Sequence, residues 1–304
     1  MKAQPLMSTI PSSDQPIVVA PTPTPFRDDD EQSVDFGALE RNIGRWLETP
    51  LSGFVVVTAN GEETMLSESE RLKTVRTVAA AHGGKKFVIA GVDERSARET
   101  LRLSENYAEA GADFIRMRIP RGMAPSDLVN YYGEVTSRCP VPVVVIHQTF
   151  ARGGDPAAPP SVIAELCGMD NVFAYITDHS ILFEQQVIPN IPDGVRKWNC
   201  SGALLAFGTM IGCDGACMLL GNIAPALCMD IISAGFRGNY VKAVELQRVA
   251  SRLNAIVMNT IGAPKTALSM LGWEYGDPRR PTAPVSAESK AAIEAVLRET
   301  DLLI

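Results

Sequence analysis

The sequence lacks any apolar run of the roughly 18 residues that a membrane-spanning helix needs. Its first residues, MKAQPLMSTIPSSDQP, also lack the apolar centre of a secretory signal. Lysine and arginine form no clustered run, and the formal net charge is −7, which argues against a nucleic-acid surface. We therefore expect a cytoplasmic protein that binds neither membranes nor nucleic acids.

Two further motifs are missing. No CxxC pair occurs among the six cysteines, which argues against a zinc ribbon or a thioredoxin-like site. No GxGxxG follows the first apolar run, which argues against a dinucleotide-binding sheet. The cysteines are therefore interpreted as small buried side chains in a reducing compartment, and no cofactor is expected.

Short apolar, β-branched runs alternate along the chain with segments of helical spacing. This alternation predicts a parallel sheet, and fully apolar strands predict that both of its faces are covered. Eight such repeats over about 220 residues favour a closed (β/α)8 TIM barrel over an open sheet. The expected strands begin in Ile17–Phe26 and continue at Gly53–Val57, Lys86–Val92, Phe114–Ile119, Val141–His147, Val172–Thr177, Val195–Asn199 and Ala216–Leu220.

After about residue 223 only helical patterns remain, which predicts a C-terminal helical bundle packed on the barrel. The domain organisation predicted is a flexible arm at 1–15, the barrel at 16–223 and a helical domain at 224–304. The expected C-terminal helices are Pro225–Ala234, Tyr240–Thr260, Pro264–Leu271 and Ser286–Glu299.

Several segments, in this order and spacing, resemble the dihydrodipicolinate synthase and N-acetylneuraminate lyase family over roughly residues 17–302. They are TPF at 24–26, NGEETMLSESER at 60–71, AGADFI at 110–115, CPVPVVVIH at 139–147, GCDGACMLLGNIAPAL at 212–227, PKTALSMLGW at 264–273 and RRPTAP at 279–284. The resemblance implies a barrel with a helical tail, a homo-oligomer (dimer or tetramer) and lyase chemistry on 2-oxo acids. It also implies a strand-six lysine that forms a Schiff base, a strand-five tyrosine and a GTTGE loop.

The sequence departs from this plan at each position. The lysine should fall at Ile176 or Thr177, depending on register, and there is no lysine from Pro159 to Val195. The tyrosine should fall at Ile146. An imine electron sink needs a primary amine, which isoleucine and threonine cannot supply. Lys197 and Lys265 are interpreted as non-catalytic, the first early in a strand and the second in the helical tail.

The loops repeat this departure. The hydroxyl pair of the GTTGE loop becomes Ala59 and Asn60, while Gly61 and Glu62 remain, and the PYY segment after strand four reads Pro120, Arg121, Gly122.

The chemistry of such barrels lies at the carboxyl ends of the strands. The polar residues expected there are Thr24, Asn60, Glu62, Arg118 or Arg121, His147, Thr177, Asp178, His179, Asn199, Ser201 and Gly202. His147, Thr177 and Asp178 are the catalytic candidates, with His147 as acid/base. The substrate-binding candidates are Ala59, Asn60, Glu62, Arg121, His179, Asn199 and Gly202, with Arg121 as carboxylate clamp and Asn60 as oxyanion donor.

Plainer roles remain open for the same residues. Asp178 would cap the following helix, Glu62 would bridge loops, Arg121 would be a solvated charge and Cys200 would only pack.

Three functional hypotheses follow. The first is a dihydrodipicolinate synthase-like lyase that acts on a small carboxylated substrate (a 2-oxo acid or sugar acid) without Schiff-base chemistry. The second is a catalytically silent homologue that binds a metabolite or a partner. The third is an aldolase in which a metal held by His147, Asp178 and His179 replaces the imine. We expect no metal under the first two.

Overall fold

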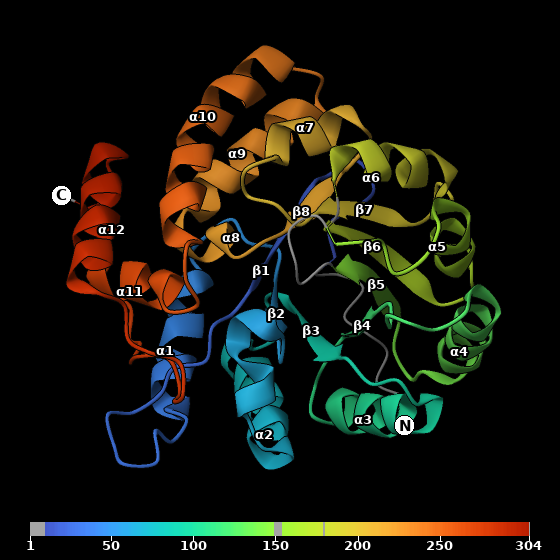
Figure 1. Cartoon of the computed structure of the whole chain (residues 1–304), viewed down its shortest axis with the longest axis horizontal. Helices are drawn as coiled ribbons and strands as arrows, with labels where there is room; N and C mark the ends of the chain where they lie inside the picture. The colour runs from blue at the N-terminus through green and yellow to red at the C-terminus, as the bar shows by residue number, and fades with distance from the viewer. Residues whose placement is uncertain (1–9, 149–153, 179, 304) are drawn as a thin grey trace.

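The computed structural model describes residues 10–148, 154–178 and 180–303. Eight parallel strands, each hydrogen-bonded to its neighbours in chain order, close into a barrel (Figure 1). The predicted (β/α)8 fold is therefore confirmed. The strands are β1 Ile17–Pro21, β2 Gly53–Val56, β3 Phe87–Val92, β4 Phe114–Arg118, β5 Val143–Gln148, β6 Val172–Asp178, β7 Arg196–Asn199 and β8 Gly215–Cys217.

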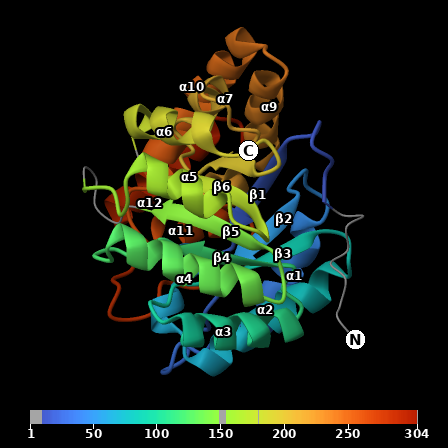
Figure 2. The same cartoon turned by 90° about the vertical axis from the view of Figure 1, so that its right-hand side faces the viewer.

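Helices surround the strands and continue into a C-terminal group. In Figure 2, α3, α4 and α5 cover one side of the barrel, whereas α9 and α10 stand at its upper end. The α-helices are α1 Phe36–Trp46, α2 Glu68–His82, α3 Ala97–Glu109, α4 Pro125–Arg138, α5 Pro160–Cys167, α6 Ile181–Val187, α7 Leu205–Met210, α8 Leu220–Ile223, α9 Pro225–Phe236, α10 Tyr240–Val257, α11 Ala263–Met270 and α12 Ala287–Glu299; short 3-10 helices are η2 Ala59–Gly61, η3 Glu63–Met65 and η4 Ile188–Asn190.

Two expected boundaries are wrong by three residues. The last strand ends at Cys217 instead of Leu220, because Leu220 already begins α8. The helix expected to run to Thr260 ends at Val257, because Met258 leaves the helical conformation. None of the helices within the described ranges is long and apolar enough to cross a membrane.

Side chains along each strand alternate between two apolar layers. On β6, Ala174 and Ile176 lie inside the barrel, whereas Tyr175 packs outward against the helices. The same alternation on β5 places Ile146 inside and Val145 outside. This alternation decides which residues at the strand ends enter the barrel interior.

The N-terminal segment contacts the barrel opposite its carboxyl end. Arg196, the first residue of β7, donates hydrogen bonds to the carbonyls of Ser12 and Gln15 at 3.2 and 2.7 Å and pairs with Asp214 at 2.7 Å. Residues 10–15 of the expected arm therefore lie against the amino ends of the strands, while 1–9 lie outside the described residues.

Candidate active site

Two arginines of β4 enter the barrel. Arg116 and Arg118 alternate with outward-facing Met117 and so share the interior side with Phe114. Arg116 is 2% exposed, and its Nη2 donates to Asp93 Oδ2 at 2.7 Å. Arg118 Nη2 lies 2.8 Å from the same oxygen. Asp93 directly follows β3, so one carboxylate compensates two buried guanidinium groups.

Further polar groups extend this cluster across the barrel mouth. Arg118 Nε donates to Gln148 Oε1 at 3.1 Å, and its Nη2 lies 3.8 Å from Glu63 Oε1. Burial raises the pKa of Glu63, and the neighbouring Asp93 raises it further. We call Glu63, Asp93, Arg116, Arg118 and Gln148 the arginine belt.

Asp178 completes the interior group from the last position of β6. It lies on the same side of the strand as Ile176, with side-chain hydrogen bonds to Cys200 and Gln148. Burial raises the pKa of Asp178 to about 7, and the negative charge of Glu184 adds to the effect, while Arg118 opposes it. A carboxyl group that exchanges its proton near neutral pH is suited to general acid–base catalysis.

The interior positions below Asp178 are apolar. Ile146 of β5 and Ile176 of β6 are register partners, and both belong to the apolar cluster inside the barrel. The resemblance left the lysine position at Ile176 or Thr177; the alternation of β6 places Ile176 inside and Thr177 outside. The interior end of β6 therefore offers a carboxyl group and aliphatic side chains in place of an amine.

Three predicted site residues form a row on the outer side of the barrel wall. On neighbouring strands β5, β6 and β7, the register partners are His147, Thr177 and Asn199. Each occupies an outward-facing position in the alternation of its strand. The expectation that they face the mouth is wrong. A strand buried on both faces has no hydrophobic alternation that would reveal which side a polar residue takes.

His147 is fully buried between the wall and the helices. Its Nε2 accepts a hydrogen bond from the Ala157 amide at 3.0 Å, and its ring centroid lies 5.2 Å from that of Phe183. Its Nδ1 is 3.9 Å from Glu184 Oε1, and Glu184 also accepts a 2.9 Å hydrogen bond from Tyr175. His147 therefore holds the segment before α5 against the barrel wall through its bond with Ala157.

The predicted metal ligands are separated by the same wall. His147 follows the outward residues of β5 and Asp178 the inward residues of β6, so the two side chains leave opposite faces of the sheet, and His179 lies outside the described residues. Among the residues described, no three His, Cys, Asp or Glu side chains are grouped as a metal site. Asp178 also does not cap α6, whose first cap position is Ser180, without a side-chain bond there.

Asn199 and Gly202 serve helix packing. Asn199 lies so close to α7 that a Cβ on Gly208 would be 2.6 Å from its Nδ2. The carbonyl of Gly202 accepts a 2.9 Å hydrogen bond from Gln247 of α10. Arg121 is exposed, and its carbonyl accepts a bond from Arg95, so the arginine placed in the interior is Arg118.

The residues of the loop after β2 face a different cavity. Ala59 and Asn60 line a cavity of about 240 Å³ together with Lys265 of α11. Glu62, in the left-handed conformation (φ 58°), pairs with the Lys265 ammonium and accepts a 2.9 Å bond from the Arg279 amide. Glu62 therefore bridges two segments, and burial lowers the pKa of Lys265.

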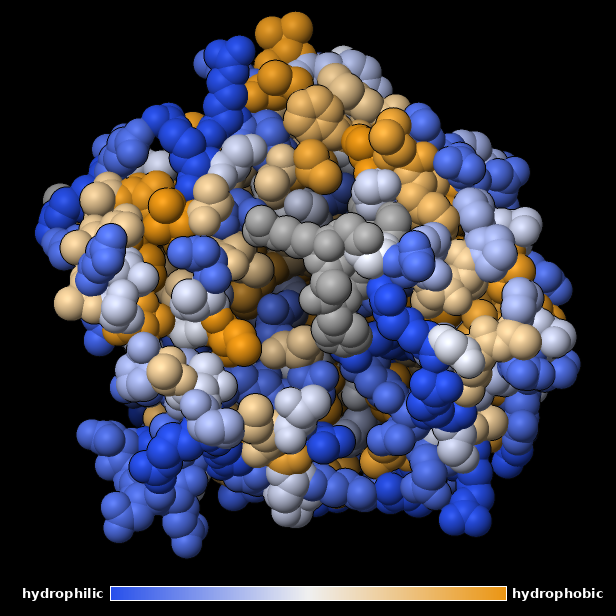
Figure 3. Space-filling view, viewed as in Figure 1, coloured by the Kyte–Doolittle hydropathy of each residue, from blue (hydrophilic) through white to orange (hydrophobic). Residues whose placement is uncertain are grey.

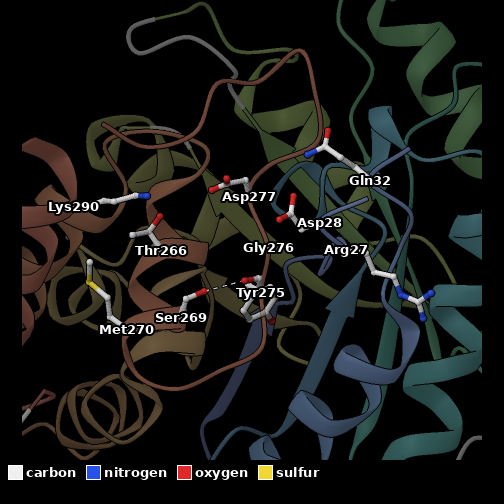
Figure 4. Close-up of a pocket in the computed structure, with 10 residues that line it drawn as sticks. All are labelled: Arg27, Asp28, Gln32, Thr266, Ser269, Met270, Tyr275, Gly276, Asp277 and Lys290. Atoms are coloured by element: carbon white, nitrogen blue, oxygen red, sulfur yellow. Dashed lines mark hydrogen bonds between the residues drawn. The ribbon is translucent and has the colours of Figure 1, made fainter. Parts of the chain in front are cut away.

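A larger hollow of about 530 Å³ lies between the loop after β1 and the C-terminal helices (Figure 4). Arg27, Asp28 and Gln32 line it on one side, and residues of α11, of α12 and of the chain around Tyr275 line the other, where Ser269 donates to the Tyr275 carbonyl at 3.2 Å. It contains no member of the arginine belt, and its charged lining residues are exposed. We therefore assign the candidate active site to the belt and Asp178.

The sequence did contain a signal for the belt. Arg116 and Arg118 stand two residues apart in the otherwise apolar strand FIRMR, and Asp93 follows the neighbouring strand. Charges in a doubly covered strand must be paired, so an interior ion pair was predictable from these residues. Figure 3 shows the molecule from the same side as Figure 1, with hydrophilic surface to the right of and below its centre and hydrophobic surface above it and to its left.

A closed eight-stranded parallel barrel with paired charges at the carboxyl ends of its strands has the architecture of (β/α)8-barrel enzymes. More particularly, residues 16–300 match the Dihydrodipicolinate synthetase family, and the chain belongs to this family. The members are lyases, which makes the protein an aldolase-type enzyme.

Individual relatives agree with this assignment. The chain is 29% identical over 284 residues to a 4-hydroxy-tetrahydrodipicolinate synthase of Methanothrix thermoacetophila, covering 90% of this chain and 93% of the relative. It is 28% identical to a DapA-like lyase of Halobacterium salinarum, covering 98% and 100%. A crystal structure of a dihydrodipicolinate synthase matches with a TM-score of 0.86 at 25% identity, covering 95% and 100%. That of Thermotoga maritima has a TM-score of 0.87 at 23% identity, covering 95% and 99%, and supports the fold.

Proposed function

We propose that the protein is a lyase that binds a small carboxylated substrate, a 2-oxo acid or sugar acid, at the arginine belt and acts on it without a Schiff base. The observation that carries this proposal is the position of Arg118 inside the mouth, near a carboxyl group, Asp178, whose pKa is raised to about 7. Guanidinium groups bind carboxylates, often through two parallel hydrogen bonds.

The belt has the electrostatic balance that an anionic ligand requires. Arg116 and Arg118 carry two positive charges, and the shared Asp93 compensates one of them. Burial raises the pKa values of both Glu63 and Asp178, so burial disfavours the charged forms of these two carboxyl groups. A substrate carboxylate would supply the remaining negative charge.

Asp178 is the proton carrier in this proposal, and Arg118 the carboxylate clamp. Thr177 and His147 support the strand ends from outside, because both lie on the outer side of the wall. Arg121 and Asn60 take no part in this proposal.

A binding experiment tests the proposal. Wild type is titrated with pyruvate, lactate and gluconate by calorimetry, beside Arg118→Gln and, as a control, the exposed Arg121→Gln. We expect Arg118→Gln to weaken acid binding by about tenfold or more, because a charged hydrogen bond is lost, while Arg121→Gln binds as wild type. Equal affinities in all three proteins would refute the site. Binding without any product in the NMR spectrum of the mixture would favour a silent metabolite-binding homologue.

We also propose that the protein is a homo-oligomer. Phe207 and Met210 of α7 and Tyr240 and Val241 of α10 are large exposed hydrophobic side chains, with Val241 85% exposed. Figure 3 shows hydrophobic surface at the upper end, where these helices lie in Figure 1. Exposed apolar patches of this kind mark protein interfaces.

A further inference from the structure

Three polar side-chain atoms in the arginine belt and its surroundings are buried without a hydrogen-bond partner among the described residues. They are Thr58 Oγ1, Asp93 Oδ1 and Arg116 Nε. Thr58 is 5% exposed and Arg116 2%. A buried polar group without a partner is costly, so such groups in native proteins need an explanation, and a ligand is one.

These residues belong to one corner of the barrel. Thr58 follows β2, Asp93 follows β3 and Arg116 lies on β4. Gly91 lies among them: a Cβ at this position would be 2.7 Å from Arg116 Nη2 and 3.2 Å from Thr58 Cγ2. The missing side chain at Gly91 thus lets the arginine and the threonine approach each other.

The three atoms differ in what they can bind. Arg116 Nε–H only donates, ionised Asp93 Oδ1 only accepts, and the Thr58 hydroxyl does both. The other oxygen of Asp93 is already engaged by both arginines. A ligand that satisfies the set must therefore offer both an acceptor and a hydrogen-bond donor.

This requirement separates the two substrate classes. A 2-oxo acid such as pyruvate has only acceptor oxygens near its carboxylate, so it would leave Asp93 Oδ1 unsatisfied. A 2-hydroxy acid has the same skeleton and adds a hydroxyl donor. Sites that hydrogen-bond a substrate hydroxyl discriminate strongly against analogues that lack it, because their own polar groups are then left unpaired.

We propose that the belt selects hydroxylated carboxylic acids, with Asp93 Oδ1 accepting the substrate hydroxyl and Arg116 Nε donating to the substrate's acidic end. This inference rests on the proposed function and narrows its substrate class. Asp93 is then a specificity-determining residue, in addition to its role in holding the two arginines.

The test compares acids that differ only at carbon 2. Lactate and pyruvate form one pair, gluconate and 2-oxogluconate the other, and dissociation constants are measured by calorimetry on the full chain. We expect the hydroxy acid of each pair to bind about tenfold or more tightly than the oxo acid.

Asp93→Asn should reverse this preference. The arginines are donors, so the amide oxygen of the substituted side chain would face them and its NH2 group would take the place of Oδ1, which turns an acceptor into a donor. Thr58→Val, nearly isosteric, should weaken hydroxy-acid binding several-fold, whereas Thr64→Val, at an exposed position of η3, should not. The Thr58 and Thr64 variants keep the test valid if Asp93→Asn fails to fold.

The outcomes separate this inference from the proposed function. If both acids of each pair bind equally and Arg118→Gln weakens both, the belt is a carboxylate site but the hydroxyl selection is wrong. Tighter binding of the oxo acid overturns it as well. If neither pair binds wild type, the carboxylate site and the selection both fail.

Discussion

Lys265 of α11 and Glu62 of the loop after β2 form a buried ion pair between the helical tail and the barrel. Lys265 is 3% exposed, and its ammonium also lies 4.1 Å from the centre of the Phe26 ring. The next residue, Glu63, lies instead within the barrel near Arg118. The carboxylates of Glu62 and Glu63 thus contact different parts of the molecule, the helical tail and the arginine belt. The left-handed backbone conformation of Glu62 turns the chain between them.

Removing one partner of this pair should destabilise the protein. We expect Lys265→Met to lower the free energy of unfolding by about 3–5 kcal/mol, because it leaves Glu62 buried and uncompensated. The double variant Glu62→Gln/Lys265→Met should recover part of the loss. Chemical denaturation measures both, and Lys197→Met, at a less buried lysine, is the control. A loss no larger than that of the control would contradict the structural role of the pair.

The raised pKa of Asp178 should appear in the pH dependence of stability. Its pKa rises from 3.8 to about 7 on folding, so the protonated group favours the folded state below pH 4, and this contribution is lost as the pH rises through 7. Relative to Asp178→Asn, the free energy of unfolding of wild type should fall by up to about 4 kcal/mol between pH 4 and pH 7. Denaturation at a series of pH values measures this difference.

A matched variant isolates the cause of that shift. Asp193 is exposed, so the difference in free energy of unfolding between wild type and Asp193→Asn should change little over the same pH range. Glu184→Gln should lower the pKa of Asp178, because Glu184 contributes to the shift after burial. An Asp178 carboxyl that titrates near pH 4 in a carbon-detected NMR experiment would remove the acid–base assignment.

Trapping with borohydride tests the imine-free chemistry. Incubation with pyruvate and sodium borohydride should leave the protein mass unchanged, because the interior positions of β5 and β6 just below Gln148 and Asp178 are Ile146 and Ile176, which have no amine. A stable mass increase would contradict the proposal. Peptide mapping would then show whether Lys265, the lysine that lines the neighbouring cavity, carries the adduct.

Gly91 should tolerate no side chain. A Cβ at this position would overlap the Val57 carbonyl and clash with Arg116. We therefore expect Gly91→Ala to lower the free energy of unfolding by about 1–3 kcal/mol or more. Gly133 lies within α4 with nothing near its Cβ position, and Gly133→Ala should stabilise the protein by about 0.5–1 kcal/mol. Thermal unfolding of the two variants distinguishes them, and equal melting temperatures would refute the close packing at Gly91.

The proposed oligomer has its own test. A charge at Val241, as in Val241→Asp, should shift the protein to a smaller species in light scattering, because the apolar surface of α10 would no longer be covered. The same change at exposed Thr64 should leave the mass unaltered. A monomeric wild type would contradict the proposal.

Much of the architecture was determined by the sequence alone. Apolar runs specified the strands to within a few residues, and Ser67 with Glu70 specified the start of α2, where both bonds of the capping box are present. The order of these elements sufficed for the (β/α)8 barrel, since strict alternation of strand and helix has few compact solutions.

The composition of the site was decided only by the tertiary structure. In strands covered on both faces, sequence neighbours such as Thr177 and Asp178 give no signal of which one points inward. A register shift opposite Val143 and Val144, where Phe173 is passed over in the pairing, further disturbs counting along β6. Closure of the barrel placed His147 outside. It also paired Arg116 with Asp93, and the packing of α11 brought Lys265 to Glu62 from a distant part of the sequence, a proximity that no local pattern encodes.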